Sequence, residues 1–289
     1  MNTLHTFGCS ITQGFALPDV VKPITNEDGI PYTPEELDDL GIIVNWEDIH
    51  VYAPSKFAWP QLLADKLGVS VNNYARRGAC FNQIARQCAI GVKDIKPNDT
   101  VIVMWTYFTR ISLQWPARTS VPLCHVIDPS WGLQSVIKGF NKFFGLSSSD
   151  YDTVDKDKEI TKWIEKSTKE TFLHPLGEFN RLYNYIVLQQ MTDGFLKATG
   201  AKVLHFSVDT VPILDQLKRV EQQLPRSLRE YNIPNPRDFY DIEVDYTCCH
   251  LLHDPRIPHA ENDMHPSMQH HTNFATCLHE EFFKESGST

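Results

Sequence analysis

The chain has 289 residues, of which 42% are hydrophobic, including 16 Phe, 10 Tyr and 6 Trp. This composition is enough to bury a full core and excludes global disorder. The formal net charge of -9 argues against nucleic acid as a partner, because binding to phosphates rests on Lys and Arg.

The sequence carries no recognisable membrane or export signal. It has no run of about 18 apolar residues, so neither a transmembrane helix nor a membrane partner is expected. The first residues lack a basic region followed by an apolar stretch, which argues against a secretory signal. The seven cysteines, an odd number, fit a reducing compartment better than a disulfide framework. We therefore expect a cytoplasmic protein, and a virion-associated one would show the same features.

Strands alternate with helices along the first part of the chain. Apolar residues recur with the period of a strand or of a helix in five segments. The expected strands are 3–7, 69–74 and 100–105, and the expected helices are 56–67 and about 80–92. The strand at 100–105 is apolar throughout, which indicates burial on both faces, as in a parallel sheet.

The same alternation continues toward the C-terminus. The expected elements are helices within 157–198, a strand at 202–206 and a last helix at 267–285. Three segments lack a clear period and are expected to be insertions, at about 15–55, 112–155 and 209–262. The whole pattern predicts one α/β domain over residues 1–289, a doubly wound sheet with helices on both faces.

Ligands of such sheets bind outside the carboxyl ends of the strands. Four segments are expected to meet at this edge. They are Gly8–Gly14, Arg77–Asn82, Trp105–Arg110 and the loop that ends at His265. Their convergence is the main structural argument for a site.

Ser10 follows the first expected strand, at a turn that opens a helix. A hydroxyl at this position can attack a carbonyl if a base removes its proton, and backbone N–H groups at the same turn can hold the developing oxyanion. The alternative is that Ser10 simply caps the helix, and taken alone this is the stronger interpretation.

His265 lies between Asp263 and Pro266, just before the last expected helix. A His beside a carboxylate is the usual general base for a serine nucleophile, and Pro266 suits the first turn of a helix. The alternative is a surface His, because the chain has 12 of them.

In its motifs and their order, the chain resembles the SGNH (GDSL-like) hydrolase superfamily. The matching segments are Gly8-Cys9-Ser10-Ile11, Asn73-Tyr74-Ala75-Arg76-Arg77-Gly78 and Asp263-Met264-His265-Pro266. The resemblance implies a three-layer α/β/α sandwich with a mostly parallel, flavodoxin-like sheet. It also implies that Ser10 is the nucleophile and His265 the base, that Asp263 orients His265, and that the N–H of Gly78 joins the oxyanion hole.

The chain departs from the family pattern at three positions. Cys9 replaces the family's Asp beside the nucleophile, and Asp263 precedes His265 by two residues where three is commoner. Phe108 stands where the family has an oxyanion Asn, and losing one such donor typically costs about 10²–10³-fold in rate. The candidate substitutes are Asn82, Thr106 and Arg110. The segment 105–110 resembles a Trp-Thr…Arg segment of phage-type SGNH-like proteins.

A metal site and a cysteine nucleophile are alternatives with less support. The residues Cys248, Cys249, His250, His253, His259, His270 and His271 lack the paired spacing of a zinc site, and no motif favours Cys9 over Ser10.

The sequence thus predicts an esterase or carbohydrate O-deacetylase that forms an acyl-enzyme and needs no metal or organic cofactor. Two alternatives stay open. Phe108 at the oxyanion position motivates an inactive binding or accessory protein, and lid-like insertions would suit an O-acyltransferase.

Overall fold

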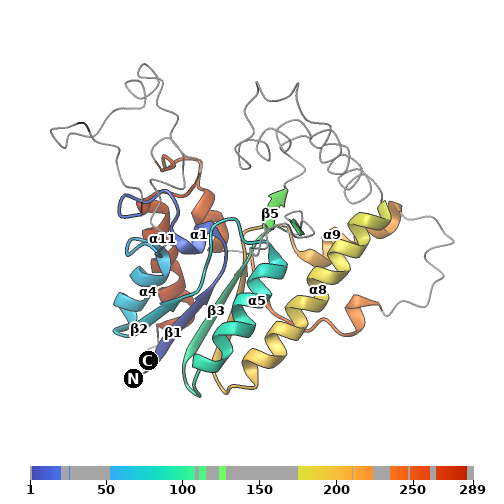
Figure 1. The fold of residues 1–289 in the computed structure, drawn as a ribbon, viewed down its shortest axis with the longest axis horizontal. Coiled ribbons are helices and arrows are strands. Elements are labelled where there is room, and N and C mark those ends of the chain that lie inside the picture. The colour runs from blue at the N-terminus through green and yellow to red at the C-terminus, as the bar shows by residue number, and fades with distance from the viewer. Residues whose placement is uncertain are drawn as a thin grey trace, which may run out of the picture.

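A parallel β-sheet forms the centre of the computed structural model (Figure 1). The structure describes residues 2–20, 26, 53–107, 111–114, 124–127, 175–209, 211–223, 235–246, 248–260 and 265–284. Within them, five strands pair side by side, each pair in parallel. In spatial order they are β2 (Ser70–Asn73), β1 (Thr3–Phe7), β3 (Thr100–Trp105), β6 (Lys202–Ser207) and β7 (Val244–Asp245).

The strand order creates a switch point beside β1. Counted along the chain, the strands of this sheet follow the flavodoxin-like order 2-1-3-4-5. The chain passes from β1 to β2 on one side and then returns to place β3 on the other side of β1. In doubly wound sheets, the loops on the two sides of such a reversal leave in opposite directions, and ligands bind in the crevice between them. The predicted doubly wound, flavodoxin-like parallel sheet is confirmed.

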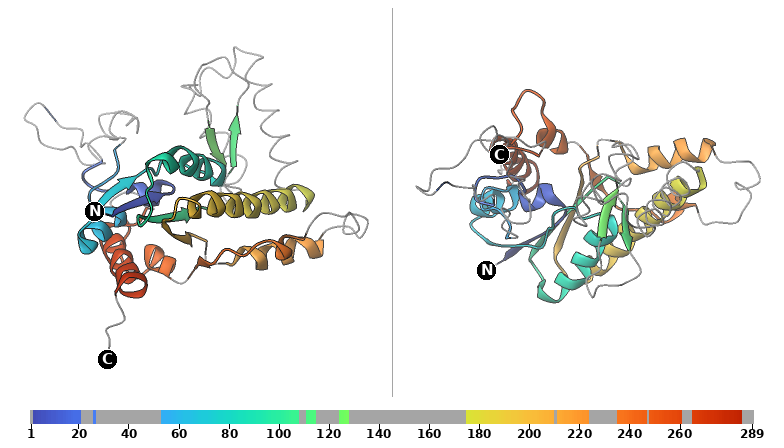
Figure 2. Two further views of the ribbon diagram at one scale, coloured as in Figure 1. Left: turned by 90° about the horizontal axis from the view of Figure 1, so that it is seen from below. Right: turned by 45° about the horizontal axis from the view of Figure 1, so that its top comes forward.

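Helices cover both faces of the sheet (Figure 2). One layer contains α4 (Trp59–Leu67) packed on α11 (Met268–Leu278), and the other contains α5 (Phe81–Gly91) packed on α8 (Pro175–Lys197). Helix α9 (Ile213–Gln223) packs on α8. Since parallel crossovers are right-handed, the reversal of direction at β1 puts the helices before and after β2 on opposite faces.

Shorter elements complete the described structure. They are α1 (Ser10–Gln13), the 3₁₀ turns η1 (Val92–Asp94), η5 (Pro236–Asp238) and η6 (Cys248–His253), the π-helical turn η7 (His279–Phe283), and an antiparallel pair of strands, β4 (Ile111–Gln114) and β5 (Cys124–Ile127). No helix in the described ranges is long and apolar enough to cross a membrane.

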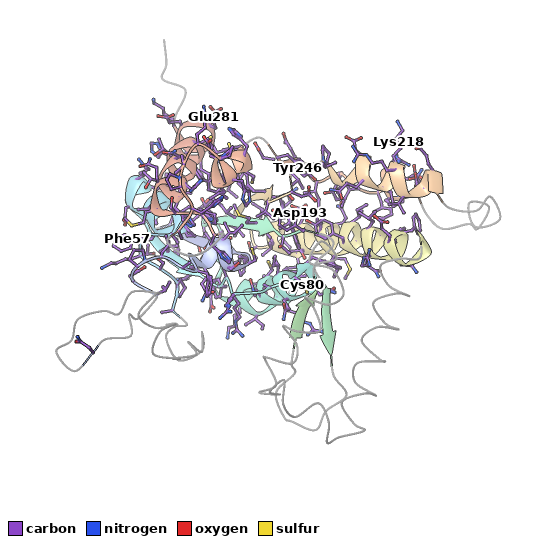
Figure 3. All side chains as sticks on the ribbon, turned by 90° about the horizontal axis from the view of Figure 1, so that it is seen from above. Phe57, Cys80, Asp193, Lys218, Tyr246 and Glu281 are labelled. Atoms are coloured by element: carbon purple, nitrogen blue, oxygen red, sulfur yellow. The ribbon has the colours of Figure 1, made fainter. Side chains whose placement is uncertain are left out.

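The core lies on both sides of β3. Its residues Val101–Trp105 are all fully buried, as their continuous apolar character predicts. On the face covered by α4 and α11, the rings of Trp59 and Phe274 meet edge to face with centroids 5.4 Å apart. On the other face, Tyr185 of α8 meets Phe81 of α5 in the same way at 5.2 Å. Figure 3 shows side chains filling both layers.

Most expected elements are present, with shifted ends. Helix α4 begins at Trp59 rather than at residue 56, because Ala58 is extended and Pro60 occupies the first turn. The last helix stops being α-helical at Leu278 and continues as η7. The segments expected to be insertions contain most of strand β4, strands β5 and β7 and helix α9, none of which was predicted from the sequence.

Candidate active site

Ser10 lies at the carboxyl end of β1, beside the switch point. The strand ends at Phe7, Cys9 occupies the N-cap position, and Ser10 is the first residue of α1. The interpretation of Ser10 as the N-cap is therefore wrong. Gly8 makes this turn possible, because a Cβ there would collide with the side chain of Thr12, whose Cβ would be 2.7 Å away.

His265 is brought to Ser10 across the whole length of the chain. Its Nε2 is 2.9 Å from the Oγ of Ser10, within hydrogen-bond distance. Ser10 is 3% exposed and His265 is half-buried. The pair therefore has the spacing that a nucleophile and its general base require.

The backbone on both sides of His265 is held by hydrogen bonds. The N–H of Ala260 donates to the carbonyl of His265 at 2.9 Å. Two residues further on, Ser267 caps α11, and its N–H donates to Nδ1 of His270 at 3.1 Å. The Nε2–H of His270 then donates to the carbonyl of Asp254 at 3.1 Å. A capping box with His in the place of Glu or Gln thus anchors the loop that carries His265.

Phe15 contacts both members of the pair, the backbone of Ser10 and the ring of His265. It directly follows Gly14, the left-handed C-cap of α1, and its N–H donates to the carbonyl of Ser10 at 2.9 Å. Its ring meets that of His265 at an interplanar angle of 62°, with centroids 4.8 Å apart. The guanidinium of Arg77 lies 4.5 Å from the centroid of the same ring. Phe15 is 4% exposed, so this contact is a packed one.

The second predicted segment lies against the α1 turn. The side-chain amide of Asn73 donates to the carbonyl of Thr12 at 2.9 Å and accepts from the N–H of Ala75 at 3.0 Å. The N–H of Arg76 donates to the carbonyl of Gly8 at 3.2 Å. Gly78 is in the left-handed region, at φ +70°, which favours glycine. These contacts hold the turn that contains Gly78 beside the start of α1.

The structure describes only two of the remaining predicted site residues, Asn82 and Thr106. Asn82 is exposed in the first turn of α5. Thr106 follows β3 and is fully buried, and its carbonyl accepts from the Tyr185 hydroxyl at 3.1 Å. Asp263, Phe108 and Arg110 lie outside the described residues, so the orienting carboxylate and the position of the family's oxyanion Asn stay predictions.

His271, next to the capping residue His270, also has a structural partner. His271 accepts the backbone N–H of Trp59 at its Nδ1, 3.2 Å away, which ties α11 to α4. Burial, followed by the neighbouring His270 and His265, lowers the pKa of His271 to about 3, so this imidazole stays neutral at physiological pH.

Among the residues the structure describes, no group of three or more His, Cys, Asp or Glu side chains is arranged to hold a metal ion.

The contacts of Phe15 and Arg77 and the capping role of His270 were not predicted from the sequence. Phe15 had one usable signal, since it directly follows a glycine that closes a turn. The role of His270 was hidden because His is an unusual third residue of a capping box. The stacking of Arg77 on Phe15 joins two loops and leaves no local pattern.

No protein-family model and no curated protein matches this chain. Among solved structures, it is similar to a G-D-S-L family lipolytic protein from Desulfitobacterium hafniense DCB-2, at 9% identity and a TM-score of 0.40, over 96% of this chain and 97% of that one. It is also similar to a family two carbohydrate esterase from Clostridium thermocellum, at 11% identity and a TM-score of 0.39, over 97% and 63%. An acetyl xylan esterase from Butyrivibrio proteoclasticus shares 10% identity at a TM-score of 0.38, over 96% and 63%.

Proposed function

We propose that this protein hydrolyses carboxylic esters with Ser10 as nucleophile and His265 as general base. The observation that carries the proposal is the 2.9 Å between Ser10 Oγ and His265 Nε2, at the carboxyl end of β1. A serine at a strand-to-helix turn, paired with a histidine from a distant loop, is the arrangement that nucleophilic acyl transfer needs. The switch-point location supports it, because ligands of doubly wound sheets bind there.

The reaction proceeds in two halves. The Ser10 hydroxyl attacks the ester carbonyl while His265 Nε2 takes its proton, and the imidazolium then protonates the departing alcohol. Water, deprotonated by His265, attacks the acyl-enzyme and releases the carboxylic acid and free Ser10. Nε2 has to be unprotonated at the start, so the ring proton is on Nδ1. Asp263 is the proposed acceptor for that N–H and would orient the ring.

The proposed oxyanion hole combines backbone N–H groups from two turns. Ser10 opens α1, so its N–H has no acceptor within that helix. Gly78 supplies the second N–H, since its turn is hydrogen-bonded to Gly8. Asn82 or Arg110 would contribute a side-chain donor. Thr106 is a further candidate, since its hydroxyl is buried and makes no hydrogen bond among the described residues.

The proposed substrates are acetyl esters, and O-acetylated carbohydrates in particular. This class rests on the resemblance to SGNH hydrolases. Acetate release from an acetylated oligosaccharide, compared with release from a short alkyl acetate, would test it. Formation of a new sugar ester when a carbohydrate acceptor is added would instead indicate an O-acyltransferase.

Hydrolysis of a short acyl ester by Ser10→Ala tests the proposal. Loss of the nucleophile should lower kcat by about 10³-fold or more without changing the fold. Ser207→Ala is the matched control, because Ser207 is also a buried serine at the carboxyl end of a strand of the same sheet. Full activity of Ser10→Ala would refute the assignment. Folded wild-type protein that turns over no ester would favour the binding-protein alternative.

A further inference from the structure

Two cysteines from separate elements, η6 and α11, lie in contact with each other. The Sγ of Cys248, in η6, lies 2.9 Å from the Sγ of Cys277, in the last turn of α11. Even nonbonded carbon atoms, which are smaller than sulfur, stay about 3.5–4.0 Å apart. The two thiols are therefore closer than ordinary packing contact, although both are reduced in this structure.

We propose that Cys248 and Cys277 are a disulfide-forming site whose oxidation joins η6 to α11. The bond would close the 249–276 segment, which contains His265. The proposal is independent of ester hydrolysis, because it concerns only the two thiols and the elements they join.

Exposure and burial favour a bond between Cys248 and Cys277 over one that involves the neighbouring Cys249. Cys277 is half-buried, so a small disulfide reagent can reach it, whereas Cys248 is 4% exposed and touches Cys277. Cys249 is fully buried, and burial, followed by Asp245 and Cys248, raises the pKa of its thiol far above the ordinary value. Cys249 therefore stays protonated and reacts poorly, since the thiolate is the nucleophile.

The chemistry is thiol–disulfide exchange with a low-molecular-weight disulfide such as oxidised glutathione. The Cys277 thiolate attacks one glutathione sulfur, forms a mixed disulfide and releases one glutathione thiolate. The Cys248 thiolate then attacks the Cys277 sulfur and releases the second glutathione. The protein loses two protons and two electrons, and the oxidised glutathione gains both as two thiols.

The new bond should stabilise the loop at its two ends. The structure already packs η6 against α11, so closure needs little movement of the backbone. Joining residues 248 and 277 closes a loop of about 30 residues, and the loss of unfolded-state entropy should raise Tm by about 5–10 °C.

The test treats the folded wild-type chain with oxidised glutathione and measures intact mass and Tm. The expected result is a mass loss of about 2 Da, reversed by dithiothreitol, together with the rise in Tm. Tryptic digestion without reductant should join the peptide 238–256 to the peptide 257–284, because cleavage after Arg256 separates the two cysteines.

Variants identify which cysteine reacts, since one peptide holds both Cys248 and Cys249. Cys249→Ala should keep the mass loss and the linked peptide, and Cys248→Ala and Cys277→Ala should each abolish both. A linked peptide that survives in Cys248→Ala would assign the bond to Cys249 and overturn the proposal. Wild-type protein that gains only glutathione adducts, or does not change in mass, would overturn it as well.

Discussion

Ser10 and His265 are 255 positions apart in the chain, yet their reactive atoms lie 2.9 Å from each other. Each residue was a weak signal in the sequence, and their meeting was predictable only from the order of strands and from the family resemblance. The contact between Phe15 and His265 could not be foreseen. It depends on the left-handed turn at Gly14 and on the exact exit angle of α1, which no local pattern encodes.

At the residue scale, the Phe15 ring should fix the orientation of the His265 imidazole. Phe15→Leu keeps an apolar side chain but removes the ring contact, and an aromatic pair is worth about 0.5–1.5 kcal/mol. If that contact positions the base in the transition state, kcat falls by about 2–10-fold while KM stays unchanged. Steady-state kinetics on a short acyl ester measure both constants.

Two variants separate positioning from simple loss of packing. Phe15→Tyr retains the ring and should recover most of kcat. Phe57→Leu removes an aromatic side chain, labelled in Figure 3, that packs in a separate cluster against Leu17, Val20 and Ala58, and it should leave kcat unchanged. Wild-type kcat in Phe15→Leu would show that the ring does not position the base.

At the element scale, predictability follows the length and the period of each element. Strand β3 and helix α4 have continuous or periodic apolar patterns, and both were predictable from the sequence. Strand β7 has two residues, Val244 and Asp245, which is too short for any period to be visible. It becomes a strand because β6 offers a free edge, a tertiary effect that local propensity does not contain.

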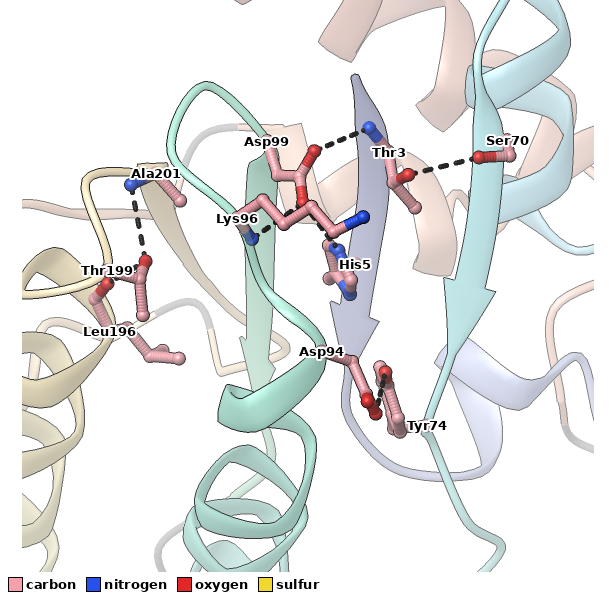
Figure 4. Close-up of polar contacts among 10 residues, drawn as sticks. All are labelled: Thr3, His5, Ser70, Tyr74, Asp94, Lys96, Asp99, Leu196, Thr199 and Ala201. Carbon is pink, nitrogen blue, oxygen red and sulfur yellow. Dashed lines mark hydrogen bonds and ion pairs between the residues drawn. The ribbon is translucent and has the colours of Figure 1, made fainter. Parts of the chain in front are cut away.

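The amino ends of β1 and β3 are joined by one carboxylate (Figure 4). Asp99 accepts the backbone N–H of Thr3 at 2.9 Å, that of Lys96 at 2.8 Å and the Nε2–H of His5 at 3.1 Å. Asp99→Asn would turn an NH₂ group toward at least one of these donors. We expect the free energy of unfolding in urea at pH 7 to fall by about 1–3 kcal/mol.

The same carboxylate should make stability depend on acid. Burial alone would raise the pKa of Asp99, but the hydrogen bonds from Thr3, Lys96 and His5 hold it below its ordinary value. The stabilisation that the ionised Asp99 carboxylate gives to the folded state is therefore complete above the unfolded-state pKa of about 3.9. It is lost as pH falls through the lower pKa that Asp99 has in the folded state. The stability difference between wild type and Asp99→Asn should shrink below about pH 4. An unchanged difference down to pH 2 would contradict this account.

Asp94→Asn is the matched control for Asp99→Asn. Asp94 is exposed and accepts only the Tyr74 hydroxyl among the contacts drawn in Figure 4. Its substitution should change stability by less than about 0.5 kcal/mol.

At the scale of the whole molecule, the order of strands and helices was enough to predict where a site would lie. Alternating elements imply a doubly wound sheet, and such a sheet has one reversal of direction, here beside β1. The chemistry at that reversal depends on loops of irregular sequence, which are the least predictable part of any chain. Asp263 and the last part of the third predicted segment, residues 108–110, lie outside the described residues, so their roles stay predictions.

Covalent labelling with a fluorophosphonate tests the catalytic pair directly, because this reagent reacts with an activated serine and mimics the acyl-enzyme step. Intact mass and tandem mass spectrometry would count and locate the label. One label is expected, on Ser10, and it should be absent in Ser10→Ala, strongly slowed in His265→Gln and retained in Ser207→Ala. Folded protein that takes up no label, or takes it up at another residue, would contradict the assignment of Ser10 and His265 as a catalytic pair.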